Sequence, residues 1–410
     1  MTQLRERVTI VGASLAGYWA AETLRRDGFE GLISLIGDED HDPYDRPPLS
    51  KKYLAGDITR DQLSLGSSEK LEALDLDLRL GQRATGLDVA AQLLEVDGVK
   101  EPYDGLVLAT GTRCRTLPKT DGVAGVHTLR TLDDAEAIRT AVQDGAERMV
   151  VVGAGFIGAE VASTAVNSGL AVTMVEALES PFSRVLGREM GMVLADLHRS
   201  HGVDLRTGVG VEEVLMAPTG SGGDRVVGVR LVDGTEVSTD LLVVGIGVIP
   251  NVDWLEGSGL DLNDGVVCDE TCLAAPNVVA AGDVARWFNV RYGESMRVEH
   301  WDNAVQQGAH AARRLMQADA EAQPFNPVPW FWSDQYDRKI QLAGRSCPDA
   351  EVRVMTGSVD EHRFVAFYGH EGRFLGALGM NRPRHVMQSK GLLEQDASWD
   401  EALAFAAEWD

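Results

Sequence analysis

Two glycine-rich segments have the residue types and spacing that hold the phosphates of a dinucleotide. They read VTIVGASLAG at 8–17 and VVVGAGFIGAE at 150–160. In such a turn the first glycine makes the bend, the second lets backbone approach a pyrophosphate, and the third allows close helix–strand packing. An acid that can bind a ribose follows about 20 residues later, Asp38 in one copy and Glu176 in the other. The chain is therefore predicted to bind two dinucleotides.

The first copy departs from the pattern at Ser14, where the middle glycine is expected. Serine is the smallest replacement that keeps a hydrogen-bond donor. We expect the phosphate turn to survive this change.

Further apolar strands must position these turns. The strands at 105–109 and 278–281 are predicted to join the sheet of the first turn, which makes the second nucleotide unit an insertion. We expect an α/β fold with two Rossmann-like dinucleotide-binding domains and a C-terminal α+β domain with a small antiparallel sheet. The expected bounds are 1–112 with 246–322, then 113–245, and finally 323–410. The last segment, Trp399–Trp409, is either a docked helix or a frayed tail.

The composition excludes several classes of partner. A net charge of −25 argues against nucleic acid and anionic membranes as partners, since a protein that binds either needs a basic surface. With no apolar run of about 18 residues and a first strand that begins by Val8, we expect a cytoplasmic protein. The four cysteines have neither disulfide nor zinc spacing, and no metal site is predicted.

The charge is unevenly spread. The segment 324–390 has nine basic and seven acidic residues, whereas 391–410 has six acids and no base. Two interpretations stay open: a solvated acidic surface, or a locally basic docking face for an acidic partner.

The order of motifs resembles the two-dinucleotide flavoprotein reductases, and within them the ferredoxin reductases that serve Rieske oxygenases and bacterial haem monooxygenases. The resemblance rests on VGASLAG, GDEDHDPYDRPPLSKKYL, LATGTRCRTLP, TLRTLDDAEAI, VVVGAGFIGAEVA, GIGVIPN, AAGDVARW, VEHWDNA and VPWFWSDQY.

This resemblance implies FAD at the first turn and NADH as substrate at the second. Asp38 would bind the adenosine ribose and Asp283 the ribityl-phosphate region, while Trp301 would flank the flavin ring. The implied FAD-binding residues are Gly12, Ser14, Leu15, Ala16, Gly17, Asp38, Arg46, Lys51, Ala84, Ala109, Thr110, Gly111, Arg130, Asp283 and Trp301. The implied NAD-binding residues are Gly153, Gly155, Phe156, Ile157, Gly158, Glu160, Glu176, Gly245, Ile246 and Gly247.

Lys51 and Glu160 are the residues implied for the hydride step. A cation beside the flavin stabilises negative charge in the reduced ring, and the glutamate can bind both the lysine and the carboxamide. Glu176 favours NADH over NADPH, because a 2′-phosphate would meet its carboxylate, and Glu179 strengthens this preference.

The electron acceptor is inferred partly from what the motifs lack. Residues 38–60 contain no cysteine, so a thiol relay is not expected there. An acidic [2Fe-2S] ferredoxin is the acceptor that the resemblance implies. Trp330 and Trp332 either lie between the flavin and the docking surface or are core aromatics. The candidate docking cations are Arg313, Arg314, Arg338, Lys339, Arg382 and Arg384.

Two other functions share these nucleotide motifs. One is a reductase of a small acceptor, similar to monodehydroascorbate or quinone reductases. The other is a flavoprotein similar to apoptosis-inducing factor, in which NADH controls partner binding. The oligomeric state stays open between monomer and homodimer.

Overall fold

Each glycine turn follows a buried strand that pairs in parallel with its neighbours in the computed structural model, which describes residues 5–220 and 222–409. The chain divides into two compact units. The first comprises the chain up to Asp45, Arg60–Arg113 and Ile249–Pro329. The second comprises Arg46–Thr59, Cys114–Val248 and the chain from Trp330 onward.

The first unit is built on a six-stranded sheet in the order β19-β20-β7-β1-β2-β3. Its strands pair in parallel except at the edge, where β19 runs antiparallel to β20. The predicted joining of the strands near 105 and 278 to the first turn's sheet is confirmed by the pairing of β7 with β1 and β20. The strands are β1 Arg7–Val11, β2 Leu32–Ile36, β3 Asp77–Arg79, β7 Gly105–Leu108, β19 Leu273–Ala275 and β20 Val278–Ala280.

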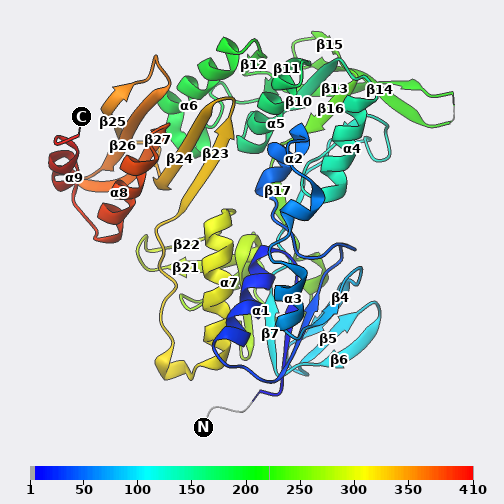
Figure 1. Cartoon of the computed structure of the whole chain (residues 1–410), viewed down its shortest axis with the longest axis vertical. Helices are drawn as coiled ribbons and strands as arrows, with labels where there is room; N and C mark the ends of the chain where they lie inside the picture. The colour runs from blue at the N-terminus through cyan, green and yellow to red at the C-terminus, as the bar shows by residue number, and fades with distance from the viewer. Residues whose placement is uncertain (1–4, 221, 410) are drawn as a thin grey trace. The chain divides into compact units, whose positions relative to one another are not determined.

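Helices cover one face of this sheet. Helix α1 (Leu15–Arg26) packs against α7 (Trp301–Met316), as Figure 1 shows. A Cβ at Gly308 of α7 would lie 2.3 Å from the carbonyl oxygen of Ala16, so this crossing depends on glycine. The small helix α3 (Ser68–Ala73) and two further sheets complete the unit: β4 Ala84–Asp88, β5 Leu93–Val96 and β6 Val99–Pro102, then β18 Val266–Cys268, β21 Ala285–Asn289 and β22 Glu294–Met296.

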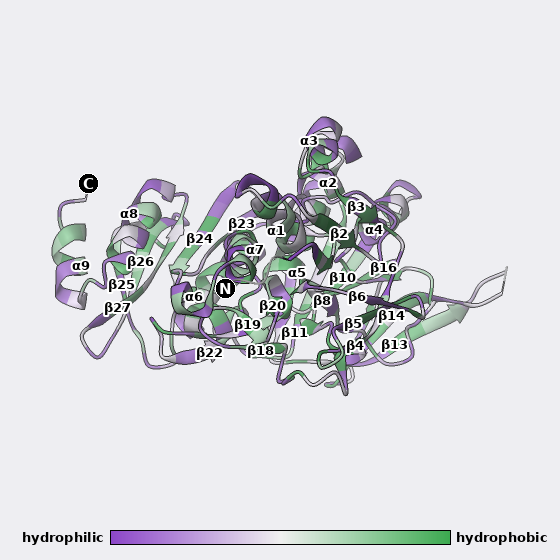
Figure 2. Ribbon diagram, turned by 90° about the horizontal axis from the view of Figure 1, so that it is seen from below, coloured by the Kyte–Doolittle hydropathy of each residue, from purple (hydrophilic) through white to green (hydrophobic). Residues whose placement is uncertain are grey.

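The second unit contains a five-stranded parallel sheet in the order β12-β11-β10-β16-β9. Its central strands are mostly apolar and buried, as expected for strands covered on both faces, with the buried runs Met149–Val152 in one strand and Leu241–Val244 in the next. Figure 2 colours apolar residues green. The strands are β9 Val126–His127, β10 Arg148–Val152, β11 Ala171–Glu176, β12 Asp204–Thr207 and β16 Leu241–Val244. The other elements are α4 Leu132–Gln143, α5 Phe156–Asn167, α6 Ser183–Ser200, and the antiparallel strands β13 Val211–Pro218, β14 Asp224–Leu231 and β15 Glu236–Ser238.

The C-terminal part of the second unit is an antiparallel sheet in the order β23-β24-β27-β26-β25 with two helices, as the sequence predicts. Helix α9 (Trp399–Ala406) begins with a capping box between Ser398 and Glu401, and Trp399 is buried. It is thus a docked helix and not a frayed tail. The other elements are β23 Trp330–Gln335, β24 Arg338–Gly344, β25 Glu351–Ser358, β26 Arg363–His370, β27 Arg373–Met380 and α8 Pro383–Glu394.

The proline-rich loop differs from its expected place. The segment Arg46–Thr59, with the short helix α2 (Lys52–Ala55), clusters with the second unit, although the sequence suggests the first domain. The reason is local bonding: Tyr53 donates to Glu136 of α4 at 2.9 Å, and Lys51 pairs with Glu160 of α5. The three expected domain boundaries stay a prediction.

None of the helices in the described ranges has both the length and the apolar character needed to cross a membrane.

Candidate functional site

The first glycine turn lies between β1 and α1, where two glycines touch backbone. Gly12 has a φ of 117°, and a Cβ there would lie 2.1 Å from the carbonyl oxygen of Ala109. A Cβ at Gly17 would lie 1.9 Å from the carbonyl oxygen of Gly12. The turn therefore requires both glycines, and it brings the N-terminus of α1 to the end of β7, where a phosphate can be bound.

Ser14 is accommodated without strain. It is the N-cap of α1 with a φ of −107°, and the corresponding Gly155, the N-cap of α5, has a φ of −84°. Any residue adopts these angles, so the backbone conformation of the middle position does not require glycine. A Cβ at Gly155 would meet no atom within 4 Å, which leaves room beside the turn.

The second turn repeats the packing of the first. Gly153 has a φ of 99°, and a Cβ there would lie 2.3 Å from the carbonyl oxygen of Gly245. A Cβ at Gly158 would lie 2.2 Å from the carbonyl oxygen of Gly153. Two apolar side chains of the predicted NAD set are exposed, Ile157 at the start of α5 and Ile246 after β16. Exposed apolar groups beside such a turn suit the rings of a dinucleotide.

The two predicted ribose acids differ in their surroundings. Glu176 ends β11, and its two oxygens accept hydrogen bonds from the backbone N–H groups of Ala154 at 2.9 Å and Leu178 at 2.8 Å. Asp38 follows Gly37 after β2 and is exposed. The acid of the second turn is thus held against its glycine turn, whereas that of the first faces solvent.

A loop behind β7 is held by an asparagine that the sequence reasoning missed. Asn251 donates from Nδ2 to the carbonyl oxygen of Thr110 at 2.9 Å, and Thr110 donates from Oγ1 to the carbonyl oxygen of Asn251 at 3.0 Å. The signal was present, since GIGVIPN is among the motifs, but only Gly245, Ile246 and Gly247 were chosen from it. Ala84, also in the FAD set, opens β4 and is buried.

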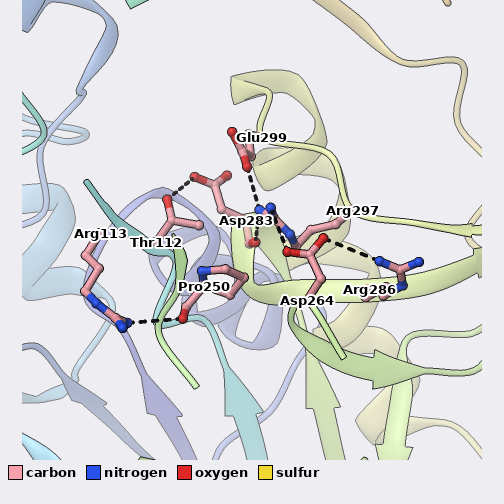
Figure 3. A network of polar contacts seen from close by, with 8 residues as sticks. All are labelled: Thr112, Arg113, Pro250, Asp264, Asp283, Arg286, Arg297 and Glu299. Atoms are coloured by element: carbon pink, nitrogen blue, oxygen red, sulfur yellow. Dashed lines mark hydrogen bonds and ion pairs between the residues drawn. The ribbon is translucent and has the colours of Figure 1, made fainter. Parts of the chain in front are cut away.

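Asp283 lies in a polar network of the first unit, drawn in Figure 3. Thr112 donates to its carboxylate at 3.3 Å, and Arg297 donates to its backbone carbonyl at 3.1 Å. Arg297 also pairs with Glu299 at 2.6 Å and with Asp264 at 3.3 Å. These bonds hold the backbone of Asp283 while its carboxylate keeps acceptor capacity for a hydroxyl group.

The remaining residues of the FAD set lie in both units. In the second, Nη1 of Arg46 donates to the carbonyl oxygen of Arg130 at 2.7 Å, so these two predicted cations are neighbours. In the first, the indole N–H of Trp301 donates to Asp45 at 2.7 Å, which orients the ring at the start of α7.

Lys51 and Glu160 form an ion pair in the second unit, in which the carboxylate is buried and the lysine is half-buried. Nζ of Lys51 lies 2.8 Å from Oε2 of Glu160, whose residue is 2% exposed. Ser50 donates to the same oxygen at 2.5 Å, and Ser333 of β23 donates to Oε1 at 2.6 Å. Three donors therefore replace water around a buried carboxylate.

The sequence reasoning predicted this pair and missed both serines. Ser50 directly precedes the chosen lysine. Ser333 was detectable only by strand alternation, which places Phe331, Ser333 and Gln335 on the face of β23 opposite Trp330 and Trp332.

Trp330 and Trp332 stack with ring centroids 5.4 Å apart and planes at 29°. Both are half-buried, so they are neither full core residues nor free surface rings.

The candidate docking cations are not equivalent. Arg314 is 6% exposed and bonds Thr271 at 2.9 Å and Asp319 at 2.6 Å, so we remove it from the docking set as a correction. The cause is its position on the inner side of α7. Arg313 is exposed and pairs with Asp27, whereas Arg338 and Lys339 pair with Asp337 and Asp334. Arg382 is half-buried and Arg384 is exposed at the start of α8.

The cysteines are free thiols. Burial raises the pKa of Cys272 to about 12 and that of Cys268 well above its usual value. Both are therefore protonated at neutral pH, which disfavours thiol chemistry. Within the described ranges, no group of acidic, histidine and cysteine side chains has the arrangement of a metal site.

Comparison with known proteins extends over nearly the whole chain. The model of the pyridine nucleotide-disulphide oxidoreductases matches residues 6–308, and that of a reductase C-terminal domain matches 330–410. The chain is 38% identical to rhodocoxin reductase of Rhodococcus erythropolis over 94% of this chain and 89% of that protein. It is 36% identical to putidaredoxin reductase of Pseudomonas putida over 95% and 92% of the two chains. A crystal structure of a covalent putidaredoxin reductase–putidaredoxin complex matches with a TM-score of 0.89 at 36% identity, covering 95% of this chain and 93% of that one.

Proposed function

We propose that this chain, which belongs to the pyridine nucleotide-disulphide oxidoreductase family and to its ferredoxin reductases, is an NADH-dependent ferredoxin reductase that uses FAD. The observation that supports this proposal best is the Lys51–Glu160 ion pair, which joins the proline-rich loop to the helix of the second glycine turn.

The residues present fit the two dinucleotides. In the first unit, the turn at Gly12 and Gly17 leaves no room for a side chain, and Asp38, Thr110 and Asp283 would hold the FAD. In the second, the turn at Gly153 and Gly158 and the carboxylate of Glu176 would hold NADH. The expected three-domain division, with the nicotinamide domain at 113–245, is part of this proposal.

The protein's own groups position and polarise the reactants. When bound, FAD can take up two electrons as a hydride and release them one at a time, which no amino acid side chain can do. Lys51 would place an ammonium group where negative charge develops, and Glu160 holds that ammonium in a fixed orientation. Because Ser50 and Ser333 also bind the carboxylate, the pair needs no reorganisation during the reaction.

The acceptor is proposed to be an acidic [2Fe-2S] ferredoxin that supplies an oxygenase. The proposed docking cations are the exposed Lys339 and Arg384 and the half-buried Arg338 and Arg382 of the C-terminal part, with Arg313 of the first unit. Trp330 and Trp332 are the proposed aromatic path. Location in the cytoplasm and the choice between monomer and homodimer remain predictions.

The test is NADH-driven reduction of a two-iron ferredoxin, coupled to cytochrome c, with ferricyanide and a quinone as control acceptors. Fast, salt-sensitive electron flow through the ferredoxin is expected. Brisk quinone reduction without a ferredoxin effect would instead identify a small-acceptor reductase. A long-lived reduced complex with feeble turnover on every ferredoxin would point to the NADH-sensing flavoprotein.

A further inference from the structure

A buried chain of hydrogen bonds begins at the Glu160 oxygen that Lys51 does not contact. Ser333 Oγ lies 2.6 Å from Glu160 Oε1, and Gln335 Nε2 lies 3.1 Å from Ser333 Oγ. Gln335 Oε1 lies 3.0 Å from His198 Nε2, and the hydroxyl group of Tyr336 lies 2.9 Å from His198 Nδ1. Glu160 is 2% exposed, and Ser333, Gln335 and His198 are 0% exposed. All five residues belong to the second unit.

The charge on Glu160 determines the direction of every bond in this chain. A carboxylate only accepts, so the Ser333 hydroxyl donates to it and must accept from the Gln335 amide N–H. The amide oxygen of Gln335 then faces His198, whose Nε2 must carry the proton. Nδ1 of His198 is left as an acceptor for the Tyr336 hydroxyl. Five side chains thus share one donor direction that ends at Glu160, an arrangement in which each bond polarises the next.

Burial supports the neutral imidazole that this direction requires. It lowers the pKa of His198 to about 4, with His201 lowering it further and the Gln335 hydrogen bond opposing the shift. His198 therefore stays neutral at physiological pH and keeps a single tautomer.

The end of the chain is held by an uncommon backbone conformation. Tyr336 has a φ of 55°, a region that bulky residues rarely adopt. Its ring stacks on His201 with centroids 3.7 Å apart, and its backbone N–H donates to Ser163 at 2.6 Å. Ser163 lies on α5 one turn after Glu160, so β23 and its turn are tied to the same helix at two points.

We propose that Ser333, Gln335, His198 and Tyr336 form a positioning relay, which keeps the Glu160 carboxylate oriented toward Lys51 and thereby supports flavin reduction by NADH. The kinetic part of this inference rests on the proposed function, whereas the tautomer of His198 does not. The relay assigns a role in the reaction to strand β23, which is far from Glu160 in sequence.

The first test is the tautomer of His198, read by NMR of protein labelled with ¹⁵N-histidine. At pH 7 we expect a neutral ring with the proton on Nε2. In the variant Ser333→Ala, Gln335 loses its acceptor and its amide is free to reverse, so we expect a mixture of tautomers. Tyr336→Phe removes the donor to Nδ1 but keeps the stacked ring, and it should have a similar effect. A proton on Nδ1 in the unmodified protein would overturn the relay.

The second test is stopped-flow reduction of the FAD-loaded protein by NADH. Ser333→Ala should lower the limiting rate by roughly 10-fold, because a misplaced group near the reacting atoms costs rate more than binding. The KM for NADH should change little, and Ser333→Thr, which restores the hydroxyl, should recover the rate.

The matched control is Ser389→Ala, since Ser389 is also fully buried but donates within its own helix, to the His385 carbonyl at 2.8 Å. It should leave both the tautomer and the rate unchanged. If Ser333→Ala and Tyr336→Phe both kept the rate of flavin reduction of the unmodified protein, the relay would be contradicted. If the unmodified protein does not accept electrons from NADH, the proposed function fails. The tautomer of His198 then still shows whether the hydrogen bonds of the relay run in the proposed direction.

Discussion

The carboxylate of Glu176 accepts a hydrogen bond at 2.9 Å from the backbone N–H of Ala154, inside the second glycine turn. The acid at the end of β11 is therefore fixed to the turn that would bind the pyrophosphate. A second bond from the N–H of Leu178, at 2.8 Å, prevents the carboxylate from rotating away. A negative charge held in this way has a direct consequence for the choice of nucleotide.

Glu176 should make the enzyme prefer NADH. Two unit charges about 4 Å apart repel by about 1 to 4 kcal/mol between water and a protein surface, so a 2′-phosphate should cost roughly 5-fold or more in kcat/KM. Glu176→Gln keeps the shape and should raise the NADPH-to-NADH ratio of kcat/KM by about 10-fold. The control Glu351→Gln changes an exposed acid of β25 that lies 3.9 Å from Arg353, and should leave the ratio nearly unchanged. Equal efficiency with both nucleotides in the unmodified protein would refute the assignment.

Removing Glu160 should destabilise the second unit as well as slow the reaction. Glu160→Leu takes the carboxylate away from the Lys51 ammonium, whose side chain is 15% exposed and which keeps a hydrogen bond to the Pro47 carbonyl. Because losing the partner of a fully buried charge costs about 3–5 kcal/mol, that range is the upper limit here. Glu160→Gln keeps hydrogen-bonding atoms and should lower the melting temperature less, while NADH still reduces the flavin slowly. Thermal melts and stopped-flow traces on the same preparations separate the two effects. A Leu variant as stable as the unmodified protein would show that the pair is hydrated.

Acid should destabilise the fold through two histidines, the buried His198 and the half-buried His300. Burial lowers the pKa of both His198 and His300 to about 4, whereas an unfolded histidine titrates near 6.5. As the pH falls below about 6.5, these histidines are protonated in the unfolded state before they are protonated in the folded state. The free energy of unfolding is therefore fully present above about pH 6.5 and decreases progressively toward about pH 4. The loss should reach at most about 3 kcal/mol for each histidine.

Melting temperatures between pH 7 and 4 measure this effect. His300→Gln should make the decline shallower, while the control His370→Gln, at a side chain that is 38% exposed, should not. A decline of the same steepness in His300→Gln would exclude His300 as a source of acid sensitivity.

Adding one methyl group beneath the docked helix α9 should lower the stability of the protein. A Cβ at Gly369 of β26 would lie 2.6 Å from the Trp399 ring, so Gly369→Ala should destabilise by about 1–3 kcal/mol. Gly391 lies inside α8, and a Cβ there would meet no atom within 4 Å. Gly391→Ala should therefore be neutral or stabilise by up to about 1 kcal/mol. Thermal melts compare the two, and equal melting temperatures would show that α9 undocks at no cost.

Docking of the ferredoxin should depend on charge, whereas the NADH step should not. Electrostatic steering can raise association rates 10-fold or more, and it weakens as salt is added. Replacing Arg384 and Lys339 by Gln should lower ferredoxin-dependent turnover at low salt and flatten its salt dependence. Flavin reduction by NADH, measured directly, should stay the same. Arg353→Gln, at an exposed arginine of β25 in the same unit, is the control. Identical salt dependence in all variants would place the docking surface elsewhere.

The sequence by itself determined the nucleotide chemistry. The glycine turns, the acids at Asp38 and Glu176, and the strands that position them are encoded within about 20 to 30 residues, where spacing along the chain dictates spacing in the fold. The apolar strands at 105 and 278 could likewise be assigned to the first sheet, because a buried parallel strand has few alternatives. Lys51 and Glu160 were identified through motifs and not through any contact visible in the sequence.

Only the tertiary structure decided which distant groups meet. Ser333, 173 positions from Glu160, completes the environment of the carboxylate, and no local pattern specifies that contact. The same holds for the burial of Arg314, which changes a predicted surface cation into an internal bond to Thr271. Helical spacing shows which side chains share a face, but what covers that face depends on the packing of segments far apart in the chain. For this reason the cofactor turns were predictable, whereas the support behind them was not.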